Sequence, residues 1–316
     1  MIGKLVKLIK ANLPVYKANT KLRSELGVWK KGLYEPGHFY SPVVNKESIE
    51  TNASFDYSDV VGGIELNVEQ QFDLLKRIAP LYSDSLFPVD GTSTFRYRYN
   101  NDYFSFSDGI FLSMVMRHFR PSKMIEVGSG FSSAAMLDTN EKFLDGSVDL
   151  TFIEPYPENR LNNLISPKDK CSVIVNTVQS VELSRFEALN AGDILFIDSS
   201  HVAKYQSDVN FVFFKVLPVL KSGVIIHFHD VFFPFEYPIE WLKQGRSWNE
   251  AYLLRAFLMY NSNFEIMLFP SLLEMHYSQW FQKHMPMCLI KHERVRINKE
   301  IIETEIRGQS IYLVKR

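Results

Sequence analysis

Short apolar segments and amphipathic segments alternate from residue 123 to residue 229, and this alternation limits the fold more than any other feature. The apolar segments are predicted strands at residues 123–128, 149–155, 171–176, 192–198 and 223–229. The segments between them are predicted helices at residues 131–143, 158–165, 181–189 and 204–220. Strands that alternate with helices form right-handed crossovers and a parallel sheet with helices on both faces. The sequence therefore predicts an α/β fold with a doubly wound, mostly parallel sheet.

Segments outside this repeat complete the predicted organisation. We expect further helices at residues 68–82, 108–120 and 248–260, and further strands at residues 263–269 and 309–315. The last strand is expected to run antiparallel at the sheet edge. Residues 1–60 are expected to form one amphipathic helix and extended segments that pack on the main domain. We therefore predict an N-terminal extension over residues 1–98 and a main domain over residues 99–316, with an aromatic insertion around residues 231–250.

Composition excludes several classes of protein. The chain has 35 Lys and Arg residues against 36 Asp and Glu residues, so no broad charge favours nucleic acid or an anionic membrane. Two cysteines among 316 residues do not make a disulfide scaffold, and a cytoplasmic location is expected. No run approaches the roughly 20 apolar residues that a membrane span requires. The first residues lack the features of a signal peptide.

A glycine turn and two acidic residues mark the first part of the predicted sheet. Gly128 and Gly130 lie between the first strand and the first helix, where glycine allows the backbone to approach a ligand closely. Ser133 stands where the dinucleotide fingerprint has its third glycine, which disfavours NAD and FAD. Glu154 ends the second strand, where an acid can accept hydrogen bonds from ribose hydroxyls. Glu126 lies within an apolar strand, and a cationic ligand would supply the partner that a buried carboxylate needs.

Five longer motifs carry a resemblance to a known family. They are "EVGSG", "FIEPYPENR", "GDILFIDSSHVAKYQSDVNF", "GVIIHFHDVFFPFEYP" and "WNEAYLLRAFL". Over roughly residues 99–270 the chain resembles class I S-adenosylmethionine-dependent methyltransferases, in particular a bacterial family with the "IDSSH … HFHD" motif pair. The resemblance implies a Rossmann-like, seven-stranded sheet with S-adenosylmethionine bound over the carboxyl ends of the first four strands.

The resemblance also implies a set of cofactor-binding residues. The glycine turn would surround the methionine part, Glu154 would bind the ribose, and the segment after the third strand would lie near the adenine. A lid segment before the first strand would add further contacts. The complete set is Ser107, Asp108, Glu126, Gly128, Ser129, Gly130, Glu154, Gln179, Ser180 and Asp198.

Histidines and aspartates follow the fourth and fifth predicted strands. Because the carboxyl ends of parallel strands meet at one edge, we expect Asp198, His201, His229 and Asp230 to converge as catalytic residues. A histidine could remove the acceptor's proton. Alternatively, Asp198, His229 and Asp230 could hold a divalent metal ion that lowers the pKa of the acceptor. This placement resembles the magnesium site of catechol-type O-methyltransferases, but a histidine replaces a carboxylate, which leaves room for manganese, iron or zinc. His227 is expected to be a core histidine.

The loop after the fifth strand is the predicted wall of an acceptor pocket. Tyr237, Trp241 and Trp248 could stack on a sugar or an aromatic ring, although core packing explains each of them equally well. The sequence thus favours an S-adenosylmethionine-dependent methyltransferase that modifies an oxygen of a small molecule or glycan and could form a homo-oligomer. Two alternatives remain open at this point. One is a metal-dependent hydrolase or oxygenase that uses the histidines and aspartates, and the other is a non-catalytic cofactor-binding module.

Overall fold

The computed structural model describes ten stretches of the chain and two units within it. The described residues are 14, 18–19, 32–52, 61–84, 87–92, 94–104, 106–290, 293–297, 300–304 and 308–316. One unit comprises residues 1–56 and 241–247, and the other comprises residues 57–240 and 248–316. The division therefore falls earlier than the predicted boundary between residues 98 and 99. The predicted amphipathic helix at the N-terminus lies outside the described residues.

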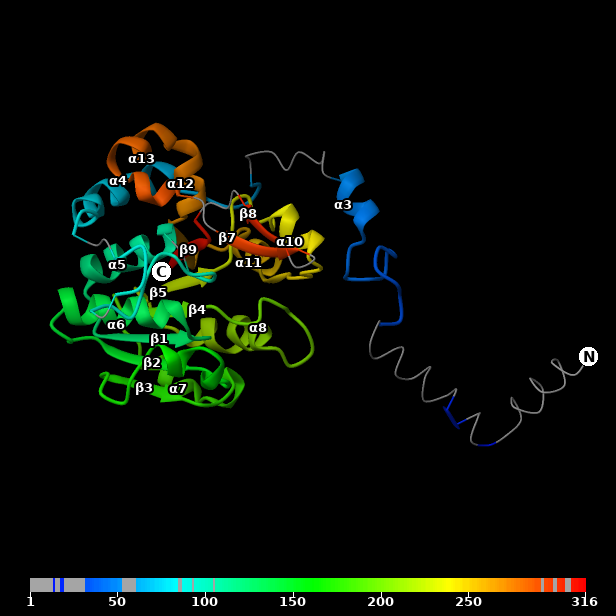
Figure 1. Ribbon diagram of the computed structural model, residues 1–316, viewed down its shortest axis with the longest axis horizontal. Coiled ribbons are helices and arrows are strands. Elements are labelled where there is room, and N and C mark those ends of the chain that lie inside the picture. Colours follow the sequence, from blue (N-terminus) through cyan, green and yellow to red (C-terminus); the bar gives the residue numbers. More distant parts are fainter. Residues whose placement is uncertain are drawn as a thin grey trace, which may run out of the picture. The chain divides into compact units, whose positions relative to one another are not determined.

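The larger unit is built on a seven-stranded sheet with the strand order β3-β2-β1-β4-β5-β9-β6 (Figure 1). All neighbouring strands are parallel except that β9 runs antiparallel to both β5 and β6. The strands are β1 (Lys123–Val127), β2 (Asp149–Ile153), β3 (Cys171–Ile174), β4 (Ile194–Ile197), β5 (Ile225–His229), β6 (Phe264–Leu268) and β9 (Ser310–Lys315). This architecture confirms the predicted Rossmann-like, doubly wound sheet.

The place of the last strand differs from the prediction. β9 is antiparallel as expected, but it lies between β5 and β6 and not at the edge. Its residues Ile311, Tyr312 and Leu313 are fully buried, as an interior strand covered on both faces requires. In β6, Phe264 and Glu265 are only partly buried, which suits the edge position.

Helices on the sheet include several that the sequence indicated. They are α4 (Val68–Ile78), α5 (Phe106–Phe119), α6 (Phe131–Phe143), α7 (Leu183–Glu187), α8 (Asp208–Phe211), the π-helical segment η5 (Val212–Val216), α9 (Leu217–Val219) and α11 (Glu250–Leu258). A further short helix is α10 (Ile239–Lys243). Helices α5 and α6 pack against each other, and α4 packs on α5 and β6. Gln71 of α4 accepts a hydrogen bond from the Phe269 backbone N–H at 2.7 Å, which ties residues 61–84 to the sheet.

Two predicted helices are shorter than expected. Residues 158–165 form only the 3₁₀ turns η2 (Pro157–Asn159) and η3 (Leu161–Asn163), and asparagine, which has a low helix propensity, is frequent in this segment. The helix expected over residues 204–220 begins at Asp208, where Ser207 accepts a hydrogen bond from the Asn210 N–H. Its second half is interrupted near Pro218, which has no N–H to donate.

Several elements near the C-terminus were not predicted. They are α12 (Pro270–His276), α13 (Ser278–His284), the 3₁₀ turn η6 (Pro286–Leu289) and a separate antiparallel pair of strands, β7 (Glu293–Ile297) and β8 (Glu300–Thr304). Other short elements are α3 (Lys46–Asn52) in the smaller unit and the 3₁₀ turns η1 (Ala79–Leu81) and η4 (Val178–Ser180). Within the described residues, no helix has the length and apolar character that crossing a membrane requires.

One face of the sheet carries polar residues inside an apolar layer. Strand register pairs Glu126 with Phe152 and Phe196, and pairs Phe196 with His227, so these side chains share a face. His229 lies two residues further along on that face. Glu126, His227 and His229 are at most 1% exposed, although the layer around them is otherwise apolar. Three buried polar groups near the carboxyl ends of the strands direct attention to that edge of the sheet.

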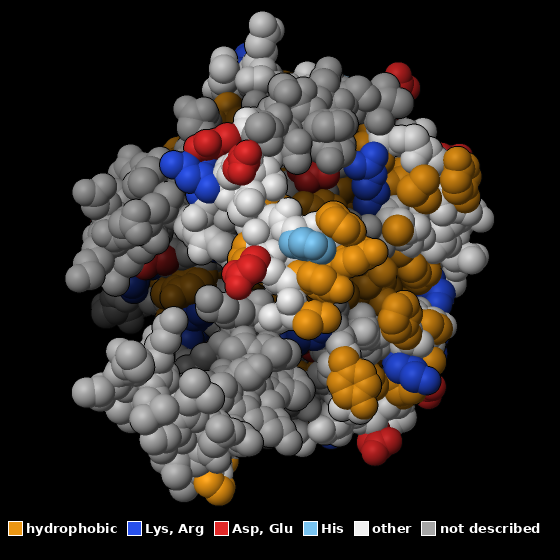
Figure 2. Space-filling view, turned by 90° about the vertical axis from the view of Figure 1, so that its right-hand side faces the viewer, with side chains coloured by type: hydrophobic (Ala, Val, Ile, Leu, Met, Phe, Trp, Pro, Cys, Tyr) orange, Lys and Arg blue, Asp and Glu red, His pale blue; other side chains and the backbone are white. Residues whose placement is uncertain are grey.

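The surface also carries exposed hydrophobic side chains. In residues 32–44 these are Leu33, Tyr34, Phe39, Tyr40 and Val44. Figure 2 shows exposed hydrophobic side chains, drawn in orange, on one face.

Candidate active site

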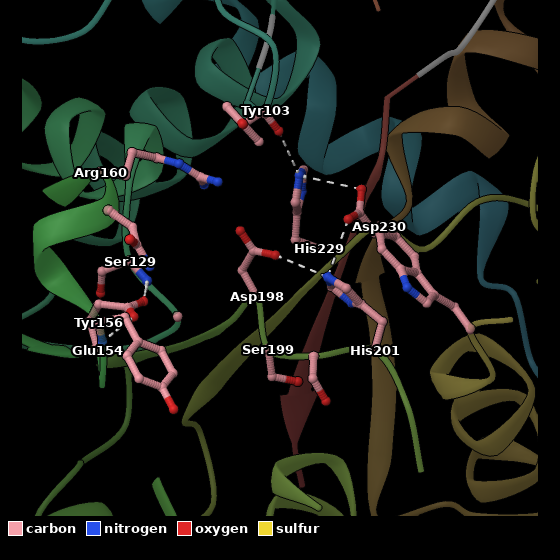
Figure 3. A pocket seen from close by; sticks show the side chains of 14 residues that line it. Tyr103, Ser129, Glu154, Tyr156, Arg160, Asp198, Ser199, His201, His229 and Asp230 are labelled. Carbon is pink, nitrogen blue, oxygen red and sulfur yellow. Dashed lines mark hydrogen bonds and ion pairs between the residues drawn. The ribbon is translucent and has the colours of Figure 1, made fainter. Parts of the chain in front are cut away.

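A cavity of about 440 Å³ opens at the carboxyl ends of β1, β2, β4 and β5 (Figure 3). The strand order reverses its direction of growth between β1 and β4, and such a switch point is where open α/β sheets bind ligands. Most of its lining residues lie at or after the ends of these strands, and Tyr103 comes from the segment before α5. The full lining is Tyr103, Gly128, Ser129, Glu154, Tyr156, Asn159, Arg160, Asp198, Ser199, Ser200, His201, His229, Asp230 and Trp248.

The glycine turn brings two loops into contact. Gly128 has a φ of +80°, and a Cβ atom placed there would lie 1.7 Å from the carbonyl oxygen of Asp198. The Gly128 N–H also donates to the carbonyl oxygen of Ile153 at 3.0 Å, which joins the turn to β2. Only glycine therefore allows the segment after β1 to lie directly on the segment after β4.

Glu154 is held with its carboxylate at the cavity wall. One carboxylate oxygen accepts the Ser129 backbone N–H at 3.0 Å, and the other accepts the Tyr156 backbone N–H at 2.8 Å. A carboxylate has about four acceptor positions, so two remain for a ligand. This geometry is compatible with the predicted contact to ribose hydroxyls.

Glu126 lies behind the cavity lining and finds its partners within the chain. The hydroxyls of Ser132 and Ser133, in the first turn of α6, both donate to its carboxylate. Burial raises the pKa of Glu126 to about 8, and the serine hydroxyls offset part of that effect. The cationic ligand that the sequence suggested as a partner is therefore not required for its burial.

Replacing Glu126 with glutamine is expected to change how stability depends on pH. The folded pKa of about 8 exceeds the ordinary value of 4.5. The stability that protonated Glu126 contributes is therefore fully present below pH 4.5 and is lost as pH rises through 8. Between pH 5 and pH 9 the unfolding free energy of the wild type should therefore fall by at least about 2 kcal/mol relative to that of Glu126→Gln, since one pKa unit corresponds to about 1.4 kcal/mol. Urea denaturation across this range measures the difference. Glu158→Gln, which removes an exposed carboxylate, is the control, and parallel curves for Glu126→Gln and the wild type would contradict the expectation.

His201 lies at the centre of three carboxylates. Its Nε2 atom is 3.2 Å from Asp198 Oδ1 and 3.3 Å from Asp230 Oδ2, and its Nδ1 atom is 2.9 Å from Glu250 Oε2. Asp198 follows β4, Asp230 follows β5, and Glu250 begins α11. The ring of Trp248 packs on the imidazole with the ring centroids 4.4 Å apart. The predicted convergence of the two strand ends therefore occurs, with His201 in the middle.

The surrounding charges decide the protonation of this cluster when no cation is bound. Burial lowers the pKa of His201, but Asp198, Glu250 and Asp230 outweigh it, so the pKa lies well above its ordinary value. Burial acts to raise the pKa of Asp198, but His229, His201 and Arg160 outweigh it and the pKa is lowered. An imidazolium at His201 has no lone pair for a proton, so the aspartates are the better bases.

His229 occupies a different position from the one that a metal ligand requires. Its Nε2 atom lies 3.2 Å from the Tyr103 carbonyl oxygen and 3.6 Å from Asp230 Oδ1, while Nδ1 is buried without a hydrogen-bond partner among the described residues. Because a carbonyl only accepts, Nε2 carries the proton. The ligand atoms that lie within 4.8 Å of one another belong to Asp198, His201 and Asp230. His201 thus replaces His229 in the predicted metal-binding set.

Backbone strain accompanies the cluster. His201 has a φ of 58° and Asp230 a φ of 57°, in the left-handed region that residues with a Cβ atom adopt rarely. Such residues cost of order 1–3 kcal/mol each and are concentrated at functional sites. Both residues follow the carboxyl ends of strands, where this conformation directs their side chains to one point.

Six residues predicted to contact a cofactor do not line the cavity: Ser107, Asp108, Glu126, Gly130, Gln179 and Ser180. Ser107 donates to Glu274, and Asp108 accepts hydrogen bonds from the Gln309 N–H and the Ser310 hydroxyl. These contacts fasten α5 to the C-terminal segments. Gln179 donates to the Gln206 carbonyl at 3.0 Å, and Ser180 lies 3.1 Å from the Thr177 hydroxyl.

The remaining predictions concern aromatic residues and His227. His227 is a core residue, stacked on Phe196 at 3.9 Å, and burial lowers its pKa well below the ordinary value. Neither ring nitrogen has a hydrogen-bond partner among the described residues. Trp248 lines the cavity, whereas Tyr237 and Trp241 are buried and do not.

Sequence reasoning missed several residues of the site, notably Tyr103, Tyr156, Asn159, Arg160 and Glu250. Arg160 lies 3.5 Å from the centroid of the Tyr103 ring, and Glu250 is only 1% exposed beside His201. Both belong to motifs quoted for the family resemblance, "FIEPYPENR" and "WNEAYLLRAFL". Inspection of every charged residue in these motifs would have identified them.

Comparisons with known proteins agree with this architecture. Residues 125–231, from β1 to just beyond β5, match the family described as "Methyltransferase domain". An uncharacterised protein from Archaeoglobus fulgidus is 32% identical over 163 residues, which cover 50% of this chain and 74% of that protein. The matched residues include most of the strands whose ends surround the cavity, and this part of the chain is similar to a methyltransferase domain. The chain belongs to the same family as the Archaeoglobus fulgidus protein.

Solved structures are related only distantly. A Podospora anserina methyltransferase bound to S-adenosylhomocysteine is 13% identical, with a TM-score of 0.37 over 70% of this chain and 90% of that one. The O-methyltransferase TomG from Streptomyces achromogenes, bound to S-adenosylmethionine, is 11% identical, with a TM-score of 0.40 over 86% and 96%. A Bacillus cereus O-methyltransferase bound to S-adenosylhomocysteine is 14% identical, with a TM-score of 0.39 over 85% and 100%. Similarity at this level does not indicate what the present chain binds.

Proposed function

We propose that this protein is an S-adenosylmethionine-dependent methyltransferase that modifies an oxygen atom of a small molecule or glycan. One observation carries the proposal. A single cavity joins a glycine turn and a fixed carboxylate, Glu154, at one end to the cluster of Asp198, His201 and Asp230 at the other. A nucleoside ligand fits the first end, and a hydroxyl group that must lose a proton fits the second.

The chain's own residues suit the cofactor. Glu154 has acceptor positions left for ribose hydroxyls, and Gly128 and Ser129 line the cavity beside it, where the methionine part would lie. When bound, S-adenosylmethionine supplies a methyl group on a positively charged sulfur. The protein then has to hold the acceptor oxygen in line with that methyl group, and such positioning is the larger part of the expected rate gain.

The aspartates account for the acceptor's proton. In the proposed reaction, a bond forms between the methyl carbon and the acceptor oxygen while the carbon–sulfur bond breaks. The electron pair of the broken bond stays on sulfur, and the acceptor's proton passes to Asp198 or Asp230. His201 holds these two carboxylates together through its Nε2 atom. Proton removal by a positioned base contributes roughly 10²–10⁴-fold in rate.

The same three residues could instead hold a divalent cation. Asp198, Asp230 and the Nε2 atom of His201 form the donor set, and Glu250 orients the imidazole through Nδ1. One imidazole with two carboxylates suits manganese, iron or zinc better than magnesium, which prefers oxygen ligands. When bound, such an ion lowers the pKa of a hydroxyl that it contacts. The ion and the Nε2 proton exclude each other, so the two forms of the proposal can be separated.

A methyl-transfer screen tests the proposal. Candidate hydroxyl acceptors are incubated with the protein and S-adenosylmethionine labelled in the methyl group, with and without EDTA. We expect label transfer to an oxygen. Recovery by Mn²⁺, Fe²⁺ or Zn²⁺ after EDTA supports the cation, and activity unaffected by EDTA supports the aspartates alone. Calorimetry that detects no binding of S-adenosylhomocysteine would exclude a methyltransferase and favour a hydrolase or oxygenase.

A further inference from the structure

We propose that Arg160 and Ser129 form a binding site for a carboxylate group within the cavity. The inference rests on the proposed function, since the carboxylate belongs either to the amino-acid end of S-adenosylmethionine or to the acceptor. It gives Arg160, which the sequence analysis did not assign, a defined chemical role, and it specifies the group that Ser129 binds.

Arg160 is held in place by two groups that are not charged. Its guanidinium carbon lies 3.5 Å from the centroid of the Tyr103 ring. On the other side, a Cβ atom at Gly130 would lie 2.8 Å from Arg160 Cδ and 3.1 Å from Nη1. The side chain therefore passes between an aromatic ring and the glycine turn, and its end is directed into the cavity (Figure 3). A cation–π contact and close packing orient the guanidinium before any ligand binds.

The charge of Arg160 has no ionic partner among the residues that the structure describes. Arg96, by contrast, binds three carboxylates, those of Asp138, Glu141 and Asp169. Arg160 is the one Lys or Arg residue that lines the cavity within the described part of the chain. Its field reaches Asp198, whose pKa it helps to lower. A guanidinium offers five N–H donors in a planar arrangement, which matches a carboxylate with two parallel hydrogen bonds.

Ser129 supplies a second, independent indication of a ligand. It lines the cavity, only 8% of the residue is exposed, and its hydroxyl forms no hydrogen bond with the described residues. The hydroxyl lies near enough to Glu126 to help lower that pKa, yet the two do not reach hydrogen-bonding geometry. A buried hydroxyl without a partner is costly, and a ligand oxygen would provide one.

The local charges favour a carboxylate over a phosphate. The 13-residue helix α6 begins beside Ser129, and its N-terminus favours a negative group. Glu154, Asp198 and Asp230 also line the cavity and would repel a doubly charged phosphate. A ligand group with a single negative charge suits these positive and negative groups better, especially when an ammonium group that Asp198 could bind lies next to it.

Binding measurements on the full-length protein test the inference and separate the two sources. The probes are S-adenosylhomocysteine, which has a carboxylate, and 5′-methylthioadenosine, which lacks the amino-acid end. If the carboxylate is the cofactor's, Arg160→Gln should weaken S-adenosylhomocysteine binding about tenfold or more and leave 5′-methylthioadenosine unchanged. Arg160→Lys should retain part of the affinity, and Ser129→Ala should weaken S-adenosylhomocysteine alone. Arg185→Gln, an exposed arginine on α7, is the matched control.

Benzoate is the probe for an acceptor carboxylate. If Arg160→Gln binds S-adenosylhomocysteine as the wild type does, benzoate should bind the wild type loaded with S-adenosylhomocysteine and not the loaded variant. The inference is overturned if Arg160→Gln binds S-adenosylhomocysteine as the wild type does and benzoate either does not bind the wild type or binds both proteins equally. If neither nucleoside binds the wild type, the proposed function fails. Benzoate binding to the unloaded protein and to Arg160→Gln then decides the carboxylate site by itself.

Discussion

Replacing Asp198 with asparagine is expected to reduce methyl transfer at least about 100-fold while the protein stays folded. The substitution keeps the shape of the side chain and the backbone hydrogen bond from the Asp198 N–H to the Val127 carbonyl. It removes the negative charge that faces His201 Nε2 at 3.2 Å, and with it a proton acceptor or metal ligand. Initial rates at saturating S-adenosylmethionine, with circular dichroism as the check on folding, measure the effect.

Two features make this prediction specific. Asp149→Asn is the matched control, because Asp149 is exposed at the amino end of β2, away from the cavity, and should keep wild-type activity. If Asp198→Asn turned over at the wild-type rate, the cluster of Asp198, His201 and Asp230 would not be the catalytic centre. Combining Asp198→Asn with EDTA shows whether the two losses have one origin, since losses through one bound ion do not add.

Replacing Gly128 with alanine is expected to destabilise the protein by at least about 3 kcal/mol and to abolish cofactor binding. Two effects combine at this position. A φ of +80° is unfavourable for alanine, and the new Cβ atom would meet the Asp198 carbonyl oxygen at 1.7 Å. The loops after β1 and β4 would have to separate, which displaces Ser129 from Asp198. Chemical denaturation and calorimetry with S-adenosylhomocysteine measure the two consequences.

Gly192→Ala isolates the steric part of this effect. Gly192 has a φ of +86°, but a Cβ atom there meets nothing within 4 Å. Its substitution should cost only the conformational part, about 1–2 kcal/mol, and leave binding intact. Equal destabilisation by the two substitutions would show that contact between the two loops is not the reason for glycine at position 128.

The local sequence pattern was sufficient to predict the strands of the main sheet. Each predicted strand is an apolar run of a length that suits a buried strand, and all seven are present in the structure within two residues of their predicted ends. The glycine turn and the polar strand ends were also identifiable, because they break these runs at fixed points. The prediction failed at residues 158–165, where helix propensity is low, and it missed the C-terminal helices α12 and α13.

The candidate site was likewise predicted only in part. Asp198 and Asp230 were expected to meet because parallel strands end at one edge of a sheet, and their contacts with His201 show that they do. Ser107 and Asp108 were assigned to the cofactor by resemblance, but they bind segments near residues 274 and 309. No local pattern shows such contacts between residues more than 150 positions apart.

The sequence by itself determined the seven strands of the sheet, the glycine at the first turn and the chemical types available at the strand ends. Only the tertiary structure decided that His201, and not His229, lies between the aspartates, that Glu250 orients it, and that Arg160 enters the cavity. The physical reason is that strand periodicity follows from neighbouring residues, whereas loop paths follow from packing between distant segments. The left-handed backbone at His201 and Asp230, which no local pattern indicated, directs these two side chains toward each other.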